Sequence, residues 1–220
     1  MKAVIFDFNG TLYNDTHLHI AAWKSFFKKY FDIDYTPEEV HRLCIGPSNV
    51  NIFKNVLAGR LEEKDYHEYS ELKEAEYRAA VLSDPKNWQL VKGATELFDW
   101  LEAHGVPFAV ATASPLGNVE LYLETLNLKK WLNMDRIVYE DGKLPSKPDP
   151  AFYNEAARRL GLTPADCLIF EDSRTGIQAA INAKAGKLVA LGHTAPMDWL
   201  KAQQEIHAIV DDFCGAERFI

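Results

Sequence analysis

Short runs of apolar residues recur along the chain, and most are followed by a stretch with helical spacing. The runs are Ala3–Phe6, Pro107–Ala111, Ile137–Tyr139, Cys167–Phe170, Lys187–Leu191 and Ala208–Val210. Strands that are apolar on both faces and alternate with helices are typical of a parallel sheet covered on both sides. From residue 88 onward the pattern therefore predicts a doubly wound α/β fold with a mainly parallel sheet and helices on both faces.

Between residues 14 and 87 the pattern changes, because no strand-like run occurs there. Four helical stretches are predicted instead, at Leu18–Tyr30, Pro37–Leu43, Val50–Ala58 and Glu62–Leu82. We therefore expect two domains, a Rossmann-like core formed by residues 1–13 and 88–220 and an inserted helical domain formed by residues 14–87. The expected hinges are Asn14-Asp15 and Asp84-Pro85-Lys86-Asn87.

Two of these helical stretches differ in the side chains they carry. The first has aromatic residues at helical spacing, which predicts a packed core: Trp23, Phe26, Phe27 and Tyr30. The last interleaves acidic and basic residues, a pattern typical of a solvent-facing helix: Glu71, Lys73, Glu74, Glu76 and Arg78.

The composition narrows the classes of protein. The chain has 220 residues, 47% of them hydrophobic and 25% charged, with a net charge of −8. This balance excludes a disordered or collagen-like chain, and no apolar stretch approaches transmembrane length. Because nucleic acids and many membrane surfaces are anionic, the negative charge argues against both as partners. We expect a monomer or homodimer that acts on small molecules.

The cysteines and the first residues bear on the compartment. Cys44, Cys167 and Cys214 are odd in number and far apart, so they form neither a disulfide framework nor a zinc-binding pattern. The apolar run Ala3–Phe6 is too short for a signal peptide and ends at a carboxylate, Asp7. Both features predict a cytoplasmic protein.

Four polar segments follow predicted strands and are candidates for chemistry. Asp7-Phe8-Asn9-Gly10-Thr11 follows the first strand, and its Asn-Gly pair also fits a simple turn. Thr112-Ala113-Ser114 follows the strand Pro107–Ala111. Its hydroxyls either cap the helix predicted at Leu116–Leu126 or bind a phosphate.

The other two segments supply charge. Lys147-Pro148-Asp149-Pro150 places a lysine in a loop stiffened by proline, and Asp149-Pro150 is typical of an N-cap followed by a first-turn proline. Glu171-Asp172 follows the strand Cys167–Phe170. Paired carboxylates at a strand end either favour a helix N-terminus or bind Mg²⁺.

Taken together, the segments favour the chemical interpretation. Asp7, Thr112, Lys147 and Asp172 each follow a different predicted strand, so a parallel sheet brings them to the same edge. A nucleophilic carboxylate, a hydroxyl, an ammonium and a metal-binding carboxylate at one point are the parts of a phosphoryl-transfer site.

The four segments resemble, in order and spacing, the four motifs of the haloacid dehalogenase superfamily. The resemblance covers the whole chain. The first motif, Asp-x-Asp-Gly-Thr, corresponds to Asp7–Thr11, and the remaining motifs correspond to Thr112, Lys147 and Glu171-Asp172. The helical insert is similar to the family's C1-type cap. The resemblance is to the phosphatase and β-phosphoglucomutase-like members.

The resemblance implies a mechanism. Asp7 attacks phosphorus and becomes an aspartyl phosphate, while Thr112 and Lys147 hold the phosphate oxygens. The implied cofactor is Mg²⁺, bound by the Asp7 carboxylate, the Asn9 backbone carbonyl and Asp172, with Glu171 supporting the ion through water. Ser114 is a further candidate for substrate binding.

Asn9 departs from the family's pattern. The phosphatases and mutases carry an aspartate there that acts as general acid and base, whereas an amide has no titratable proton. We expect metal binding through the backbone to be kept and the acid–base cycle to be lost, unless another group replaces it. The phosphonatases and dehalogenases of the family carry alanine and tyrosine at this position, so Asn9 supports neither directly.

Two segments of the insert bear on the substrate. His19-Ile20-Ala21-Ala22-Trp23 resembles a segment of β-phosphoglucomutases in which the histidine lies near the substrate. Asn49 stands where those mutases tend to carry a phosphate-binding arginine, which argues against a mutase. We predict a Mg²⁺-dependent phosphatase that acts on a small phosphorylated metabolite. The alternatives are a sugar phosphomutase, a phosphonatase, or a catalytically weakened phosphate-binding protein.

Overall fold

The computed structural model describes residues 1–83 and 87–220. The chain folds into two compact units, which we call the α/β core (Met1–Asn14 and Gln89–Ile220) and the helical insert (Asp15–Trp88). Of the hinge expected at residues 84–87, all but Asn87 lies outside the described residues.

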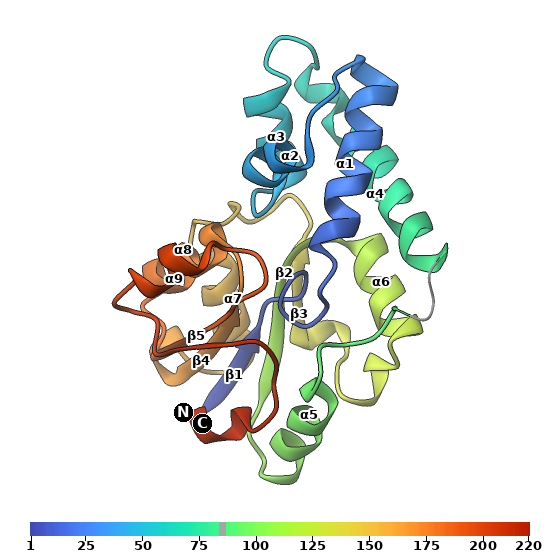
Figure 1. Ribbon diagram of the computed structural model, residues 1–220. Coiled ribbons are helices and arrows are strands. Elements are labelled where there is room, and N and C mark those ends of the chain that lie inside the picture. Colours follow the sequence, from blue (N-terminus) through green and yellow to red (C-terminus); the bar gives the residue numbers. More distant parts are fainter. Residues whose placement is uncertain (84–86) are drawn as a thin grey trace. The chain divides into compact units, whose positions relative to one another are not determined.

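The core is built on one six-stranded sheet in the order β3-β2-β1-β4-β5-β6 (Figure 1). Every pairing between neighbouring strands is parallel. The strands are β1 (Ala3–Phe6), β2 (Phe108–Pro115), β3 (Ile137–Glu140), β4 (Cys167–Glu171), β5 (Lys187–Leu191) and β6 (Ala208–Val210). The predicted α/β fold with a parallel sheet is confirmed.

Helices cover both faces of this sheet (Figure 1). They are α5 (Ala94–Ala103), α6 (Leu116–Thr125), α7 (Ala151–Arg159), α8 (Arg174–Asn182) and α9 (Met197–Lys201). On one face, apolar side chains of α7, α8 and α9 form a continuous cluster with those of the strands. On the other face, Phe98 of α5 packs against Phe6 and Phe108, with ring centroids 5.4 and 5.2 Å apart. Because both faces are covered, all four residues of β1 are buried.

The strand order reverses direction at β1, in the middle of the sheet. The chain passes from β1 outward to β3 and then returns to the other side of β1 with β4. Such a reversal leaves a crevice at the carboxyl ends of the two central strands, where α/β proteins bind ligands. Asp7 follows β1, and Glu171 ends β4, so the sheet topology brings these two together.

The helical insert contains α1 (Thr16–Phe31), α2 (Pro37–Cys44), α3 (Asn49–Val56) and α4 (Tyr66–Ser83), preceded by a 3₁₀ turn at Glu63–Asp65. α2 begins with a capping box, in which Thr36 and Glu39 each bond to the other's backbone N–H. The predicted aromatic core is confirmed, because Trp23, Phe26 and Phe27 are buried together and Tyr30 packs against them.

Two expectations about the core's local structure are wrong. β2 does not end at Ala111 but continues to Pro115, because its pairing with β3 resumes at Glu140 after a register shift. Thr112 and Ser114 therefore lie on a strand and do not cap α6, whose N-cap is Pro115. The N-cap of α7 is Pro150 and not Asp149, although Asp149 Oδ1 still accepts the Ala151 N–H at 2.9 Å.

The expectation of a solvent-facing α4 is also wrong in part. Lys73 and Glu74 are buried, with Lys73 only 1% exposed. The two side chains form an ion pair of 2.9 Å, and Lys73 Nζ lies over the rings of Trp23 and Tyr77. A pair that satisfies its own charges can be buried in this way, which the alternation of charges did not reveal.

Among the described residues, no helix is both long and apolar enough to cross a membrane.

Candidate active site

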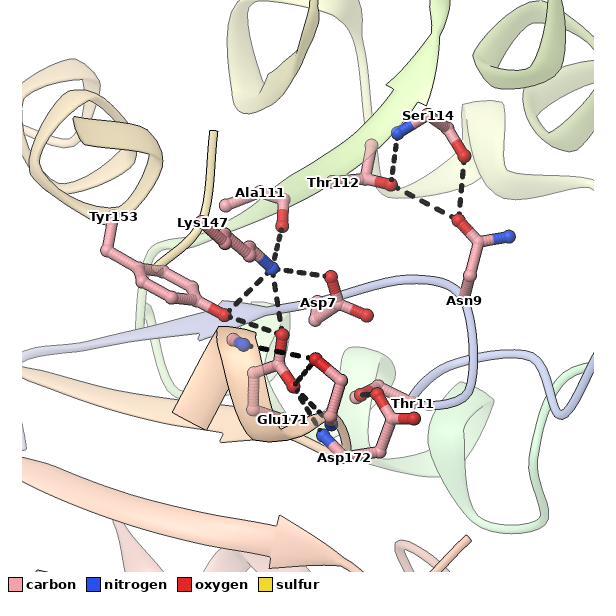
Figure 2. A network of polar contacts seen from close by, with 12 residues as sticks. Asp7, Asn9, Thr11, Ala111, Thr112, Ser114, Lys147, Tyr153, Glu171 and Asp172 are labelled. Atoms are coloured by element: carbon pink, nitrogen blue, oxygen red, sulfur yellow. Dashed lines mark hydrogen bonds and ion pairs between the residues drawn. The ribbon is translucent and has the colours of Figure 1, made fainter. Parts of the chain in front are cut away.

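Asp7 lies directly after β1, at the carboxyl edge of the sheet. Its backbone N–H donates to Phe170 O of β4 at 3.0 Å, which holds it against the neighbouring strand. Its carboxylate is buried, and Oδ1 accepts a hydrogen bond from Lys147 Nζ at 2.7 Å (Figure 2). A buried carboxylate is costly without a cationic partner. Lys147 supplies that charge.

Lys147, in the loop between β3 and α7, joins segments that are far apart in the sequence. Its Nζ lies within hydrogen-bond distance of Asp7 Oδ1 (2.7 Å), Glu171 Oε1 (2.8 Å), Tyr153 OH (3.0 Å) and Ala111 O (3.2 Å). Burial alone would lower the pKa of this ammonium, but the charges of Asp7 and Glu171 hold the pKa well above its usual range. Lys147 is therefore a fixed positive charge beside Asp7.

Glu171 uses both of its carboxylate oxygens on neighbouring groups. Oε1 accepts from Lys147 and from the Tyr153 hydroxyl at 3.1 Å, while Oε2 accepts the backbone N–H groups of Asp172 and Ser173, each at 2.7 Å. Gly176, on the first turn of α8, lies so close that a Cβ there would overlap the Glu171 carboxylate. Glu171 thus shapes the turn after β4 and positions Lys147.

Asp172 faces the Asn9-Gly10-Thr11 turn. Its Oδ1 accepts a hydrogen bond from Thr11 Oγ1 at 2.9 Å. Gly10 has a φ of +83°, and a Cβ at this position would overlap the Asp172 carboxylate, so the turn requires glycine. Burial, together with the charges of Glu171 and Asp7, holds the pKa of Asp172 well above its usual range.

The three acidic residues form a candidate cation site. Ligand atoms of Asp7, Glu171 and Asp172 lie within 4.8 Å of one another, and all three residues are buried. Lys147 bonds to two of these three carboxylates. Burial and the charges of Glu171 and Asp7 raise the pKa of the third, Asp172, which indicates an excess of negative charge. Hard oxygen donors in such surroundings suit a hard divalent cation. The donor set therefore fits the metal that the sequence predicts.

Two hydroxyl groups of β2 contact the Asn9-Gly10-Thr11 turn at Asn9, whereas Asp172 contacts it at Thr11. Asn9 Oδ1 accepts from Ser114 Oγ at 2.7 Å and from Thr112 Oγ1 at 3.3 Å (Figure 2). Asn9 Nδ2 donates to the hydroxyl of Tyr122 at 2.9 Å. The structure thus brings Asn9, Thr112 and Ser114 together beside Asp7, as the sequence predicts.

Two tyrosines of the site were missed at the sequence level. Tyr122 contacts Asn9, and Tyr153 contacts Lys147 and Glu171. Both are buried in the core, and each lies on a helix at a spacing that predicts a packed apolar face. Nothing in that spacing distinguishes a tyrosine whose hydroxyl meets a functional group from one that only fills space.

His19 lies in the helical insert, and its described partners belong to that unit. Lys73 Nζ donates to His19 Nδ1 at 2.8 Å, because an ammonium has no acceptor. His19 Nε2 lies 3.4 Å from Asp15 Oδ2, which also accepts a hydrogen bond from the Tyr77 hydroxyl. His19 therefore belongs to a polar network within the insert.

The Lys73–Glu74 pair completes this network. Asn49 Nδ2 donates to Glu74 Oε1 at 2.8 Å. Burial alone would raise the pKa of Glu74, but Lys73 beside it, with smaller contributions from His19 and Asn49, lowers the pKa to about 2. Asn49 stands where β-phosphoglucomutases tend to carry a phosphate-binding arginine, and here its side chain is bonded to a carboxylate.

Known proteins similar to this chain point to one family. A family model described as haloacid dehalogenase-like hydrolase matches residues 4–190. The chain is 30% identical to a phosphorylated carbohydrates phosphatase of Thermotoga maritima, over 88% of this chain and 87% of that one. It is also 30% identical to validoxylamine A 7'-phosphate phosphatase of Streptomyces hygroscopicus subsp. limoneus, over 83% of this chain and 82% of that one.

A solved structure supports the same assignment. The chain superimposes on a HAD hydrolase of family IA, variant 3, from Entamoeba histolytica with a TM-score of 0.88 and 31% identity, covering 98% of this chain and 95% of that one. The region that the family model matches includes all four motif segments and the helical insert. The chain belongs to the haloacid dehalogenase-like hydrolases.

Proposed function

We propose that the protein is a Mg²⁺-dependent phosphatase that acts on a small phosphorylated metabolite through an aspartyl phosphate on Asp7. The observation that carries the proposal is the position of Asp7, next to a fixed ammonium and two further carboxylates at the crevice edge of the sheet. The names of two relatives, phosphatases for a phosphorylated carbohydrate and for validoxylamine A 7'-phosphate, support this substrate class.

Asp7 is the proposed nucleophile. Its Oδ1 accepts a hydrogen bond from Lys147, which holds the carboxylate in place. Two anions repel each other, and Lys147 offsets this repulsion when a phosphate approaches the carboxylate. Thr112 is the proposed hydroxyl donor to a phosphate oxygen, and Ser114 a second donor beside it.

The proposed metal ligands are Asp7, Asp172 and the backbone carbonyl of Asn9. When bound, Mg²⁺ supplies positive charge for the phosphate oxygens and a fixed position for the substrate. Because Glu171 already accepts hydrogen bonds at both oxygens, we assign it a supporting role, in line with the expected contact through water.

A panel of phosphorylated metabolites tests the proposal. Inorganic phosphate release is measured with Mg²⁺ and with EDTA, for the native protein and for Asp7→Asn, which removes the nucleophile at nearly constant volume. We expect release that needs both Mg²⁺ and Asp7. Equal release by a folded Asp7→Asn variant would overturn the assigned chemistry. Isomerisation of a sugar phosphate dependent on a bisphosphate would identify a mutase instead.

A further inference from the structure

Position 9 lies in a closed ring of hydrogen bonds. Asn9 bonds to the Tyr122 hydroxyl at 2.9 Å and to Ser114 Oγ at 2.7 Å, and these two hydroxyls lie 3.1 Å apart. Because Ser114 uses its single hydrogen on Asn9, the Tyr122 hydroxyl donates to Ser114. Each member of the ring therefore donates once and accepts once within it.

The amide at position 9 closes the ring, because it donates at one end and accepts at the other. A carboxylate there would accept from both hydroxyls and donate to neither, so the bond between Tyr122 and Ser114 would be lost. Tyr122 is 2% exposed, and its ring stacks on that of Phe8 with centroids 4.0 Å apart. The partners of Asn9 are thus rigidly placed, and the amide is matched to them.

The charged groups around Asp7 are already engaged by other partners. Lys147 Nζ lies between Asp7 and Glu171, at 2.7 and 2.8 Å from their carboxylate oxygens. Both oxygens of Glu171 accept hydrogen bonds, from Lys147, Tyr153 and two backbone N–H groups. Position 9, by contrast, carries an amide, which has no titratable proton.

We infer that the amide at position 9 shifts the selectivity of the site toward acyl phosphates relative to alkyl phosphate esters, an inference that rests on the proposed function. A carboxylate leaving group has a pKa near 4 and departs as an anion at neutral pH. An alkoxide is far more basic, comparable to hydroxide from water with a pKa near 15.7, and needs a proton as it leaves. A site without an acid at position 9 therefore discriminates between the two.

The steps balance without an acid. An Asp7 carboxylate oxygen forms a bond to phosphorus, the bond between phosphorus and the acyl oxygen breaks, and its electron pair leaves on the released carboxylate. One acyl phosphate thus replaces another. Water then attacks phosphorus, the electron pair of the breaking bond returns to the Asp7 carboxylate, and both protons of the water leave with the phosphate.

The experiment compares acetyl phosphate with glycerol 3-phosphate as probes, and measures kcat/KM for each. Acetyl phosphate is intrinsically more reactive, so the decisive quantity is the change in the acyl-to-alkyl ratio between the native protein and Asn9→Asp. We expect the substitution to lower this ratio about 10²-fold or more, the usual range of general acid catalysis. Intact-mass analysis of the native protein confirms that Asn9, which precedes glycine, has not deamidated.

Two further variants keep the outcomes distinct. Asn9→Ala and Tyr122→Phe both leave position 9 without an acid, so both should keep the native preference. A ratio unchanged in Asn9→Asp, or alkyl turnover that depends on the Tyr122 hydroxyl, overturns the inference. Release from neither probe, with no release from any phosphate of the panel, is instead a failure of the proposed function.

Discussion

Lys147 in the α/β core and Lys73 in the helical insert are both buried, 3% and 1% exposed, and each is paired with a carboxylate. Their surroundings differ in charge. Lys147 bonds to the carboxylates of Asp7 and Glu171, which cluster with that of Asp172. Lys73 bonds to Glu74 and to the ring of His19. The two lysines are therefore equally buried, but the negative charge around Lys147 exceeds its positive charge, whereas the charges around Lys73 are balanced.

The pKa values of the acidic partners report this difference. Burial and like charges raise the pKa of Asp172, while Lys73 overcomes burial and lowers the pKa of Glu74 to about 2. An excess of buried negative charge costs stability until a cation arrives, so it is typical of a binding site. A pair that is already neutral has no such need and acts as part of the packing of the insert.

The first prediction concerns substitution of the two buried lysines. Lys147→Met removes the charge that offsets phosphate beside Asp7, and turnover should fall about 10²–10³-fold. Lys73→Met leaves Glu74 buried without its cation, and the free energy of unfolding should fall by about 3–5 kcal/mol. Urea unfolding and phosphate release measured on both variants check the pair. If Lys73→Met unfolds at the same urea concentration as the native protein, the insert pair has no structural role.

The second effect distinguishes the two carboxylates at the carboxyl end of β4, Glu171 and Asp172. Asp172→Ala removes a proposed ligand and should weaken Mg²⁺ activation more than about 100-fold, whereas Glu171→Ala removes a positioning group and should weaken it about 10–100-fold. Activity is titrated with Mg²⁺ after EDTA treatment, with near-ultraviolet circular dichroism as the control for folding. Equal or reversed losses would mean that the two roles are interchanged.

The third prediction is that removing one carboxylate from each unit changes the free energy of unfolding in opposite directions. In EDTA, Asp172→Asn relieves the crowding of carboxylates and should raise the free energy of unfolding. Glu74→Gln weakens a neutral pair and should lower it by about 2–3 kcal/mol. Thermal midpoints of the two variants test this prediction. Destabilisation by Asp172→Asn in EDTA would show that the core site has no unbalanced charge.

The fourth effect is the pH dependence of the insert pair, which is gradual within any one pH unit. The pKa of Glu74 is about 2 in the folded protein and near its ordinary value of 4.5 when unfolded. Its contribution to stability is therefore complete above pH 4.5 and is lost as the pH falls toward 2, by at most about 1.4 kcal/mol per pH unit. The stability difference between the native protein and Glu74→Gln should shrink across this window. A difference that stays constant from about pH 5 to about pH 2.5 contradicts the assigned pair.

Much of the fold could be predicted from local patterns of apolar and polar residues. The runs Ala3–Phe6 and Lys187–Leu191 match β1 and β5, because strands covered on both faces are continuously apolar. The end of β2 was not predictable, since the extension to Pro115 depends on pairing with β3 rather than on the residues themselves. Lys73 and Glu74 were also misassigned, because a charged residue is expected to be exposed unless its partners are known.

The candidate site divides in the same way. The order of the residues is enough to predict that Asp7, Thr112, Lys147 and Asp172 follow separate strands, and a parallel sheet then brings them to one edge. It also shows that position 9 carries an amide. The partners of that amide could be found only from the folded core, because Tyr122 and Ser114 come from segments more than 100 residues away. Hydrogen-bond partners at such separations are selected by the packing of the whole core, and no local pattern of residues encodes them.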